Sequence, residues 1–184
     1  MVLSEDERVE RRQVLLEKCF ELFVKQGLEN TSINDLASYC NIYKSALYNF
    51  FESKDEIVLE SAKMYMKKLD DMFFKEFVTP KHNIKETLKT CFEVVAKERD
   101  KLRYIYQIIS SPTYGDEARR EISEVYISYL GYSSKLAQMY NVDYSSFKPW
   151  FLIYIAIIHD YCLWEDETLT KEKLDFVYEQ VCGI

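Results

Sequence analysis

The sequence predicts an all-α protein of about nine helices. Only four glycines and three prolines occur in 184 residues, so breaks are few and the elements between them are long. Apolar residues recur at three- and four-residue spacing, and no segment shows the sustained alternation of a strand. With 48% hydrophobic residues, the chain can bury a sizeable core. Its length suits one compact domain or a small module fused to a larger one.

The first predicted helix covers about residues 4–26 and ends at Gly27. Glycine tolerates the left-handed backbone that closes many helices, so its place directly after an apolar segment is a stop signal. The buried face of this helix is marked by one apolar stripe, made of Leu15, Leu16, Cys19, Phe20, Leu22 and Phe23.

Two short helices follow, joined by a tight turn. Ser32 is the expected N-cap of the first, and Asp35 lies where a negative charge favours the helix dipole. This helix ends near Cys40, and residues 41–43 form the turn. The second short helix covers about residues 43–51.

Six longer helices make up the rest of the chain. The first of them begins at a capping box of Ser53 and Glu56 and ends before Pro80. The next four have apolar stripes at residues 84–95, 102–109, 118–136 and 151–158. Ser146 is the expected N-cap of the helix that carries the stripe at residues 151–158, and Pro149 is tolerated in the first turn of that helix. The last predicted helix covers about residues 171–182.

Two short helices joined by a three-residue turn form a helix-turn-helix. The major groove of DNA admits one helix, whose N-terminal residues contact the bases. Lys44 can reach guanine or a phosphate, Ala46 can touch a thymine methyl, and Asn49 can read adenine. The residues expected to meet DNA are Thr31, Ser32, Tyr43, Lys44, Ser45, Ala46, Tyr48, Asn49 and Lys54.

Residues 14–57 resemble the head of the tetracycline-repressor-like (TetR) family of transcriptional regulators. The order and spacing match at Leu22-Phe23, Gly27, Thr31-Ser32-Ile33, Leu36-Ala37, Ile42, Lys44, Leu47-Tyr48, Phe51 and Ser53-Lys54. The resemblance implies a DNA-binding domain over residues 1–56, joined by a long helix to a ligand-sensing and dimerisation domain over residues 57–184.

Three positions depart from the family pattern. Tyr43 stands where a small polar residue is usual, Ser45 where glycine is frequent, and Asn49 where histidine or tyrosine is common. These positions vary with operator sequence in such proteins, so the departures bear on which DNA is read.

The charge of the head argues against a strongly basic DNA-binding surface. Residues 1–56 hold seven basic and eleven acidic side chains, a net charge of −4, whereas residues 43–54 alone carry +1. We therefore expect few charged contacts to phosphates and a weak dependence of DNA affinity on salt.

Aromatic residues are frequent after residue 57 and have two interpretations. At helical spacing they fit an ordinary core, and by resemblance some of them line an effector pocket. His159 is likewise either a satisfied core or surface histidine or a polar anchor for a ligand, and no metal site is expected. The candidate pocket residues are Tyr65, Phe92, Tyr104, Tyr126, Tyr154 and His159.

The segment 151–158 is apolar nearly all round, which is typical of a helix covered on every side. In the family, the last two helices of two subunits pack into a four-helix bundle. The candidate homodimer interface is therefore Phe151, Ile155, Ile158, Val177, Tyr178 and Val181.

Together these features favour a ligand-responsive transcriptional regulator, a repressor by resemblance. It would bind palindromic double-stranded DNA as a homodimer and be released by a small apolar or aromatic effector. The alternative is a helical protein-interaction or adaptor module whose helix-turn-helix does not bind DNA. The acidic head favours that alternative, whereas Lys44, Tyr48 and Lys54 speak against it.

No enzyme and no cofactor are expected, because the sequence holds no nucleophile–base pairing, no HExxH and no glycine-rich phosphate loop. The five cysteines are odd in number and form no CxxC motif, which favours reduced thiols in the cytoplasm. The N-terminus has no apolar core typical of a secretory signal. The longest apolar run, residues 150–158, is too short for a bilayer, which needs about 20 residues.

Overall fold

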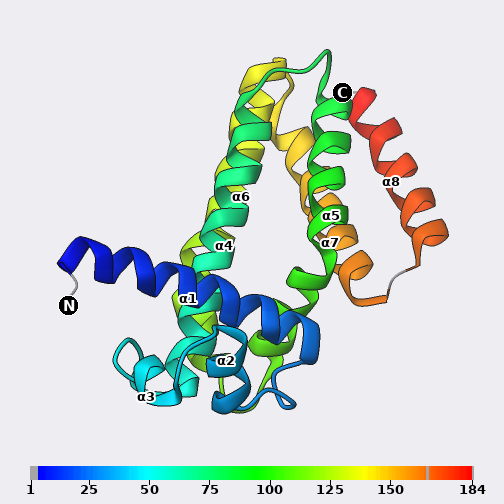
Figure 1. Cartoon of the computed structure of the whole chain (residues 1–184). Helices are drawn as coiled ribbons and strands as arrows, with labels where there is room; N and C mark the ends of the chain where they lie inside the picture. Colours follow the sequence, from blue (N-terminus) through cyan, green and yellow to red (C-terminus); the bar gives the residue numbers. More distant parts are fainter. Residues whose placement is uncertain (1–3, 165, 184) are drawn as a thin grey trace. The chain divides into compact units, whose positions relative to one another are not determined.

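The computed structural model describes residues 4–164 and 166–183, without the side chain of Tyr126 (Figure 1). The all-α prediction is confirmed. The described residues form eight helices: α1 (Glu5–Gln26), α2 (Ile33–Tyr39), α3 (Lys44–Leu47), α4 (Lys54–Val78), α5 (Ile84–Ser110), α6 (Gly115–Tyr140), α7 (Tyr144–Trp164) and α8 (Glu167–Cys182). None of these helices is long and apolar enough to cross a membrane.

Helix α5 joins two helices that the sequence analysis separates, which reduces the expected nine to eight. The interval between the two apolar stripes, residues 96–101, reads Ala-Lys-Glu-Arg-Asp-Lys. Most of these residues are good helix formers, and none is glycine or proline. A gap in the apolar stripe here marks a polar stretch of one helix rather than its end.

The chain divides into two compact units. The first comprises Met1–Met66 and Tyr104–Ile122, and the second comprises Lys67–Arg103 and Ser123–Ile184. The helix-turn-helix lies in the first unit, which also takes in the start of α4, the end of α5 and the start of α6. Helices α4, α5 and α6 each continue from one unit into the other.

Helices α1, α2 and α3 share a small core in the first unit. Phe23, Leu36 and Leu47, one from each helix, are completely buried. Gly27 ends α1 as predicted, and its φ of +85° is one that other residues rarely adopt. Ser53 accepts a hydrogen bond from the amide of Glu56 at 3.1 Å, so α4 also begins where the sequence predicts.

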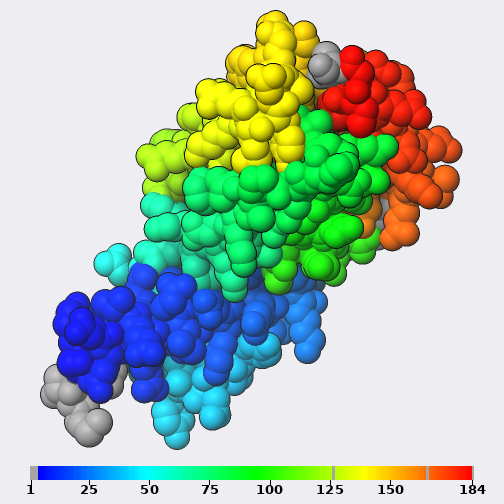
Figure 2. Space-filling model, turned by 90° about the horizontal axis from the view of Figure 1, so that it is seen from above, coloured from blue at the N-terminus to red at the C-terminus, as the bar shows by residue number. Residues whose placement is uncertain are grey.

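In the second unit, α7 and α8 pack against each other, and α8 also lies beside α5 (Figures 1 and 2). Helix α7 begins earlier than predicted, because Asp143 rather than Ser146 supplies the cap: its carboxylate accepts the Ser146 amide at 2.8 Å. Helix α8 begins at Glu167, capped by Asp166, four residues before the predicted start. Aspartate is a good N-cap, because its side-chain oxygen accepts a hydrogen bond from a backbone amide of the first turn.

Candidate nucleic-acid interface

The turn between α2 and α3 is held by its backbone. Asn41 has a φ of +56°, in the left-handed region where asparagine is enriched. Around it, the amide of Asn41 donates to the carbonyl of Ser38 and the amide of Ile42 donates to the carbonyl of Ala37, both at 3.0 Å. This pair of bonds is a Schellman motif, which closes α2 and sets the direction in which the chain enters α3.

Helix α3 is a single turn, shorter than the predicted range 43–51. After Leu47 the backbone tightens: the amide of Asn49 donates to the carbonyl of Ala46, and that of Phe50 to the carbonyl of Leu47. Leu47 and Phe51 are buried, as predicted, and fix the inner face of this segment. The opposite face is therefore held outward on a rigid base.

That outer face carries the residues expected to read DNA. Tyr43 is 86% exposed and Tyr48 is 45% exposed, and Lys44, Ser45 and Asn49 are exposed as well. The Lys44 ammonium lies 5.9 Å from the centre of the Tyr48 ring, close enough for a cation–π contact. Ala46 is half-buried. The face thus combines one cation, two phenols and small side chains that permit close approach to a groove.

The other three candidates have roles within the protein. Ser32 caps α2 in a reciprocal box with Asp35, with amide-to-oxygen distances of 2.8 and 3.2 Å, and stays exposed. Thr31 is only 1% exposed, and its hydroxyl donates to the Gly27 carbonyl at 2.7 Å. The ammonium of Lys54 donates to the carbonyl of Leu28 at 3.0 Å. Thr31 is thus a structural residue, and the Lys54 side chain is partly committed to the fold.

Two arginines of α1 take part in this region, although the sequence analysis did not select them. Arg8 donates to the carbonyl of Asn49 and Arg12 to that of Phe50, each at 3.1 Å. Arg12 also pairs with Glu56 at 2.7 Å and with Glu60, and these partners raise its pKa. The spacing of the two arginines, four apart on one face of α1, is the sequence signal that could have found them.

Comparison with known proteins also indicates a helix-turn-helix regulator. A family model described as bacterial regulatory proteins, tetR family, matches residues 15–61. The HTH-type transcriptional repressor KstR2 of Mycobacterium tuberculosis is 30% identical over 135 residues, which cover 72% of this chain and 64% of the repressor. The KstR2 repressor of Rhodococcus jostii is 29% identical over 133 residues and is covered over 63% of its length. The chain thus spans less than two thirds of these relatives.

Residues 15–61 form a helix-turn-helix head of the TetR family. Solved structures agree in fold over nearly the whole chain. A Clostridium perfringens putative fatty acid metabolism regulator is 18% identical, with a TM-score of 0.65. The superposition covers 92% of this chain and 97% of the regulator. A putative TetR-family regulator of Mesorhizobium loti is 12% identical, with a TM-score of 0.71, and covers 96% and 95%. At these identities the likeness concerns the fold alone.

Two of the predicted pocket residues belong to a ring cluster of the first unit. Tyr65 stacks on Phe20 with ring centres 4.6 Å apart, and Tyr104 stacks on Phe23 at 5.8 Å. Tyr104 is 3% exposed, and its hydroxyl has no hydrogen-bond partner among the described residues. Burial raises the pKa of this phenol, so it stays protonated and able to donate.

The other predicted pocket residues do not form one site. The Tyr154 phenol is buried and donates to the Leu88 carbonyl at 2.7 Å, so this tyrosine is a core residue. His159 is half-buried, and burial lowers its pKa. Tyr126 lies on α6, with its side chain outside the described structure. Phe92 does line a cavity of about 320 Å³, formed by α5, α7 and α8.

The residues predicted for the dimer interface are mostly covered within the chain itself. Five of the six side chains are buried: Phe151, Ile158, Val177, Tyr178 and Val181. The sixth, Ile155, is half-buried. Periodicity could not separate the two sides of α7, because both are apolar. The exposed large apolar side chains of α7 and α8 are instead Tyr144, Leu152, Ile153, Leu163, Trp164, Leu169 and Phe176. Half-buried Trp150 adjoins them, with its ring centre 5.9 Å from that of Phe176.

Proposed function

We propose that this chain is a TetR-family transcriptional regulator that binds double-stranded DNA through α3. The observation that carries the proposal is the exposed face of Tyr43, Lys44, Ser45, Tyr48 and Asn49, set on a buried base behind a Schellman turn. The similar KstR2 proteins are named transcriptional repressors, which favours repression. Such a regulator would act in the cytoplasm, where its operator lies.

The chemistry of this face assigns each residue a role. The Lys44 ammonium would donate to guanine O6 and N7 or to a phosphate, and the Asn49 amide would pair with adenine. The phenols of Tyr43 and Tyr48 would donate to phosphate oxygens and so position the helix. Ser45 is small enough to let the backbone of α3 approach the groove.

Binding as a homodimer is the second part of the proposal, and it uses different residues from those the sequence suggested. Ile153 and Phe176 are 43% and 55% exposed, and Trp150 packs edge-on against Phe176. Apolar side chains gathered in this way on two packed helices favour a partner surface. A second copy would bury them, and a two-fold axis would place two α3 helices on a palindrome.

The third part is release of DNA by a small effector. A ligand that binds one conformation of the dimer better than the other shifts the population between DNA-competent and incompetent states. Helices α4 and α5 are each continuous between the two units and can carry such a change. The buried, unpartnered phenol of Tyr104 is a donor that an effector can satisfy.

Selection of bound duplexes from a random DNA pool, at low and moderate salt, tests the proposal. We expect a palindrome to be enriched by the wild-type chain and by Lys97→Ala, an exposed α5 control. Lys44→Ala, which removes the same charge from α3, should lose the enrichment while its circular dichroism stays helical. Failure of the folded wild type to enrich any duplex would leave the adaptor function as the better account.

A further inference from the structure

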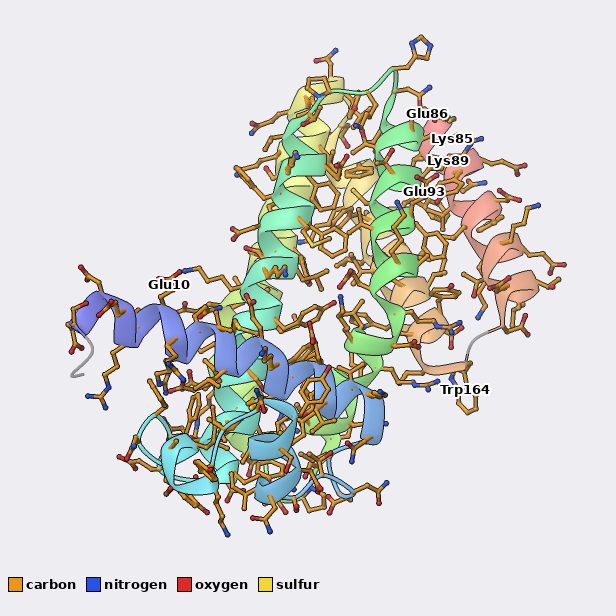
Figure 3. The ribbon with its side chains drawn as sticks, in the orientation of Figure 1. Glu10, Lys85, Glu86, Lys89, Glu93 and Trp164 are labelled. Carbon is orange, nitrogen blue, oxygen red and sulfur yellow. The ribbon has the colours of Figure 1, made fainter. Side chains whose placement is uncertain are left out.

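Two cysteine side chains meet in the core of the first unit. Cys19 comes from α1 and Cys40 is the C-cap of α2, and their Sγ atoms lie 3.8 Å apart. The two helices pack against each other, and Figure 3 shows side chains of α1, the helix with the labelled Glu10, directed toward α2. Two thiols in contact can join as a disulfide once both lose their hydrogen atoms.

Cys40 is the better nucleophile of the two. The Cys19 thiol donates to its sulfur and the ammonium of Lys18 adds a positive charge, so the pKa of Cys40 is lowered despite its burial. Cys19 keeps its proton, because the hydrogen bond to Cys40 and burial raise the pKa of Cys19. The thiolate is the form of cysteine that attacks a peroxide. The pair thus holds a nucleophile and, in contact with it, a second thiol that can resolve the product.

An oxidant reaches the pair from the side of Cys40. This residue is 5% exposed, whereas Cys19 is completely buried. Helix α2 has only seven residues, and the ends of such short helices open locally at a low cost in free energy. Hydrogen peroxide is nearly as small as water, so a brief opening of this end admits it. The first oxidation step therefore falls on Cys40.

The other three cysteines lack such a partner. Cys91 and Cys162 are buried, and burial raises the pKa of each thiol. Cys182 is exposed, but no second thiol contacts it within the described part of the chain. A sulfenic acid formed at any of these three positions would have no thiol of the same subunit beside it to condense with. We therefore expect oxidation within one subunit to join Cys19 and Cys40 alone.

The pair lies beside the turn that sets the direction of α3. The amide of Cys40 donates to the carbonyl of Leu36 at 2.9 Å, and the next residue is Asn41 with its left-handed backbone. Because a disulfide is about 2.05 Å long, closing the contact of 3.8 Å brings the two sulfur atoms together by about 1.8 Å. Side-chain rotation takes up part of this shift, and the rest draws the end of α2 toward α1.

We propose that Cys19 and Cys40 are a redox-sensitive pair, which a peroxide converts into a disulfide that alters the helix-turn-helix. First, the Cys40 thiolate attacks the peroxide: an S–O bond forms, the O–O bond breaks, and the leaving hydroxide takes up the proton that Cys40 released. Second, the Cys19 sulfur attacks that of Cys40: the S–S bond forms, the S–O bond breaks, and the oxygen leaves with the Cys19 proton as water. Two thiols lose two electrons, and the peroxide becomes two waters.

Formation of the disulfide is independent of DNA binding, whereas its effect on DNA affinity rests on the proposed function. A binding face works only within about 0.5 Å of its productive geometry. A shift at Cys40 is passed through Asn41 to α3, which carries the candidate base contacts. Oxidation should therefore weaken binding to the operator, and a thiol reductant should restore it.

Peptide mapping of the full chain tests the disulfide. Cleavage after lysine and arginine places Cys19 in the peptide 19–25 and Cys40 in the peptide 26–44. After treatment with hydrogen peroxide and alkylation of the remaining thiols, we expect these two peptides to be recovered joined, two hydrogen masses below their sum. Reduction should separate them. Recovery of both peptides in the alkylated form, after peroxide has oxidised other thiols of the chain, would overturn the proposal.

Two variants locate the effect on DNA. Fluorescence anisotropy with the operator selected by the reduced chain should show about tenfold weaker binding after oxidation, the loss of about one good base contact. Cys182→Ser, which removes the exposed thiol, should respond as wild type does, whereas Cys40→Ser should bind equally before and after peroxide. Unchanged affinity of a fully disulfide-bonded wild type would refute the effect on the helix-turn-helix. A reduced chain that selects no operator would contradict the proposed function instead, and the mapping would still decide on the pair.

Discussion

The amide of Ile42 donates to the carbonyl of Ala37 at 3.0 Å across the left-handed residue Asn41. This bond closes α2 and turns the chain toward α3, whose exposed face carries the candidate DNA contacts. The same arrangement recurs at the end of α6, where the amide of Val142 donates to the carbonyl of Ala137 across Asn141, with φ of +53°. Asparagine at such a position accepts a conformation that branched residues avoid.

Substitution of Asn41 therefore separates backbone strain from side-chain chemistry. Asn41→Val should destabilise the first unit by about 1–2 kcal/mol, because a β-branched residue is strained at positive φ. Asn41→Gly should change stability by less than about 0.5 kcal/mol. Urea unfolding followed by circular dichroism measures both, and equal losses for the two variants would show that the left-handed turn is not the cause.

Removing the cation of α3 should weaken DNA binding without unfolding the chain. Lys44→Ala should raise the dissociation constant for the selected operator about tenfold, which corresponds to about 1.4 kcal/mol for one good contact. Lys97→Ala on α5 is the matched control and should stay within twofold. Fluorescence anisotropy with a labelled duplex measures both constants, and parallel losses would point to a general effect of charge.

DNA affinity should depend weakly on salt. Arg12 is engaged with Glu56 and Glu60, Lys54 donates to a backbone carbonyl, and Arg8 donates to Asn49, so few cations remain for phosphates. We expect a slope of log affinity against log salt of about −2 to −4 for a dimer, against about −10 for a strongly basic repressor. Measuring the dissociation constant for the operator between about 50 and 200 mM salt gives this slope. A slope of about −10 would refute the prediction.

Substitution of exposed apolar residues of α7 and α8 should change the oligomeric state, whereas substitution of a buried residue should lower folding stability. Ile153→Ser with Phe176→Ser should convert a dimer to a monomer in analytical ultracentrifugation and leave helix content intact, because both side chains are exposed. Phe151 is completely buried, so Phe151→Ala should instead cost about 3–5 kcal/mol of folding stability. A dimer unaffected by the double serine variant would exclude this face.

Tyr104→Phe should stabilise the ligand-free chain. A buried hydroxyl without a partner costs about 1–3 kcal/mol, and phenylalanine keeps the ring stacking on Phe23. We expect a higher melting temperature in differential scanning calorimetry. Tyr154→Phe, whose hydroxyl is bonded to the Leu88 carbonyl, should lower it and serves as the contrast. A lower melting temperature for Tyr104→Phe would mean that its hydroxyl is already satisfied.

The sequence by itself determined the helical class, the end of α1 at Gly27, the cap of α2 at Ser32 and the turn that precedes α3. These features depend on interactions within four or five residues, such as capping bonds and backbone conformations, and residue types at fixed spacing report them directly. The candidate DNA face follows from them, because a turn of known length sets which side of the next helix points outward.

Only the tertiary structure decided which of the candidate side chains are exposed and which are held within the protein. It buried Thr31, tied Lys54 to Leu28 and Arg12 to Phe50, and placed Phe151 in the core and Ile153 at the surface. The hydrogen bonds of Lys54 and Arg12 join residues 26 and 38 positions apart. Periodicity indicates that a helix has an apolar face, but where both faces are apolar, as in α7, only the packing partners determine which one is covered.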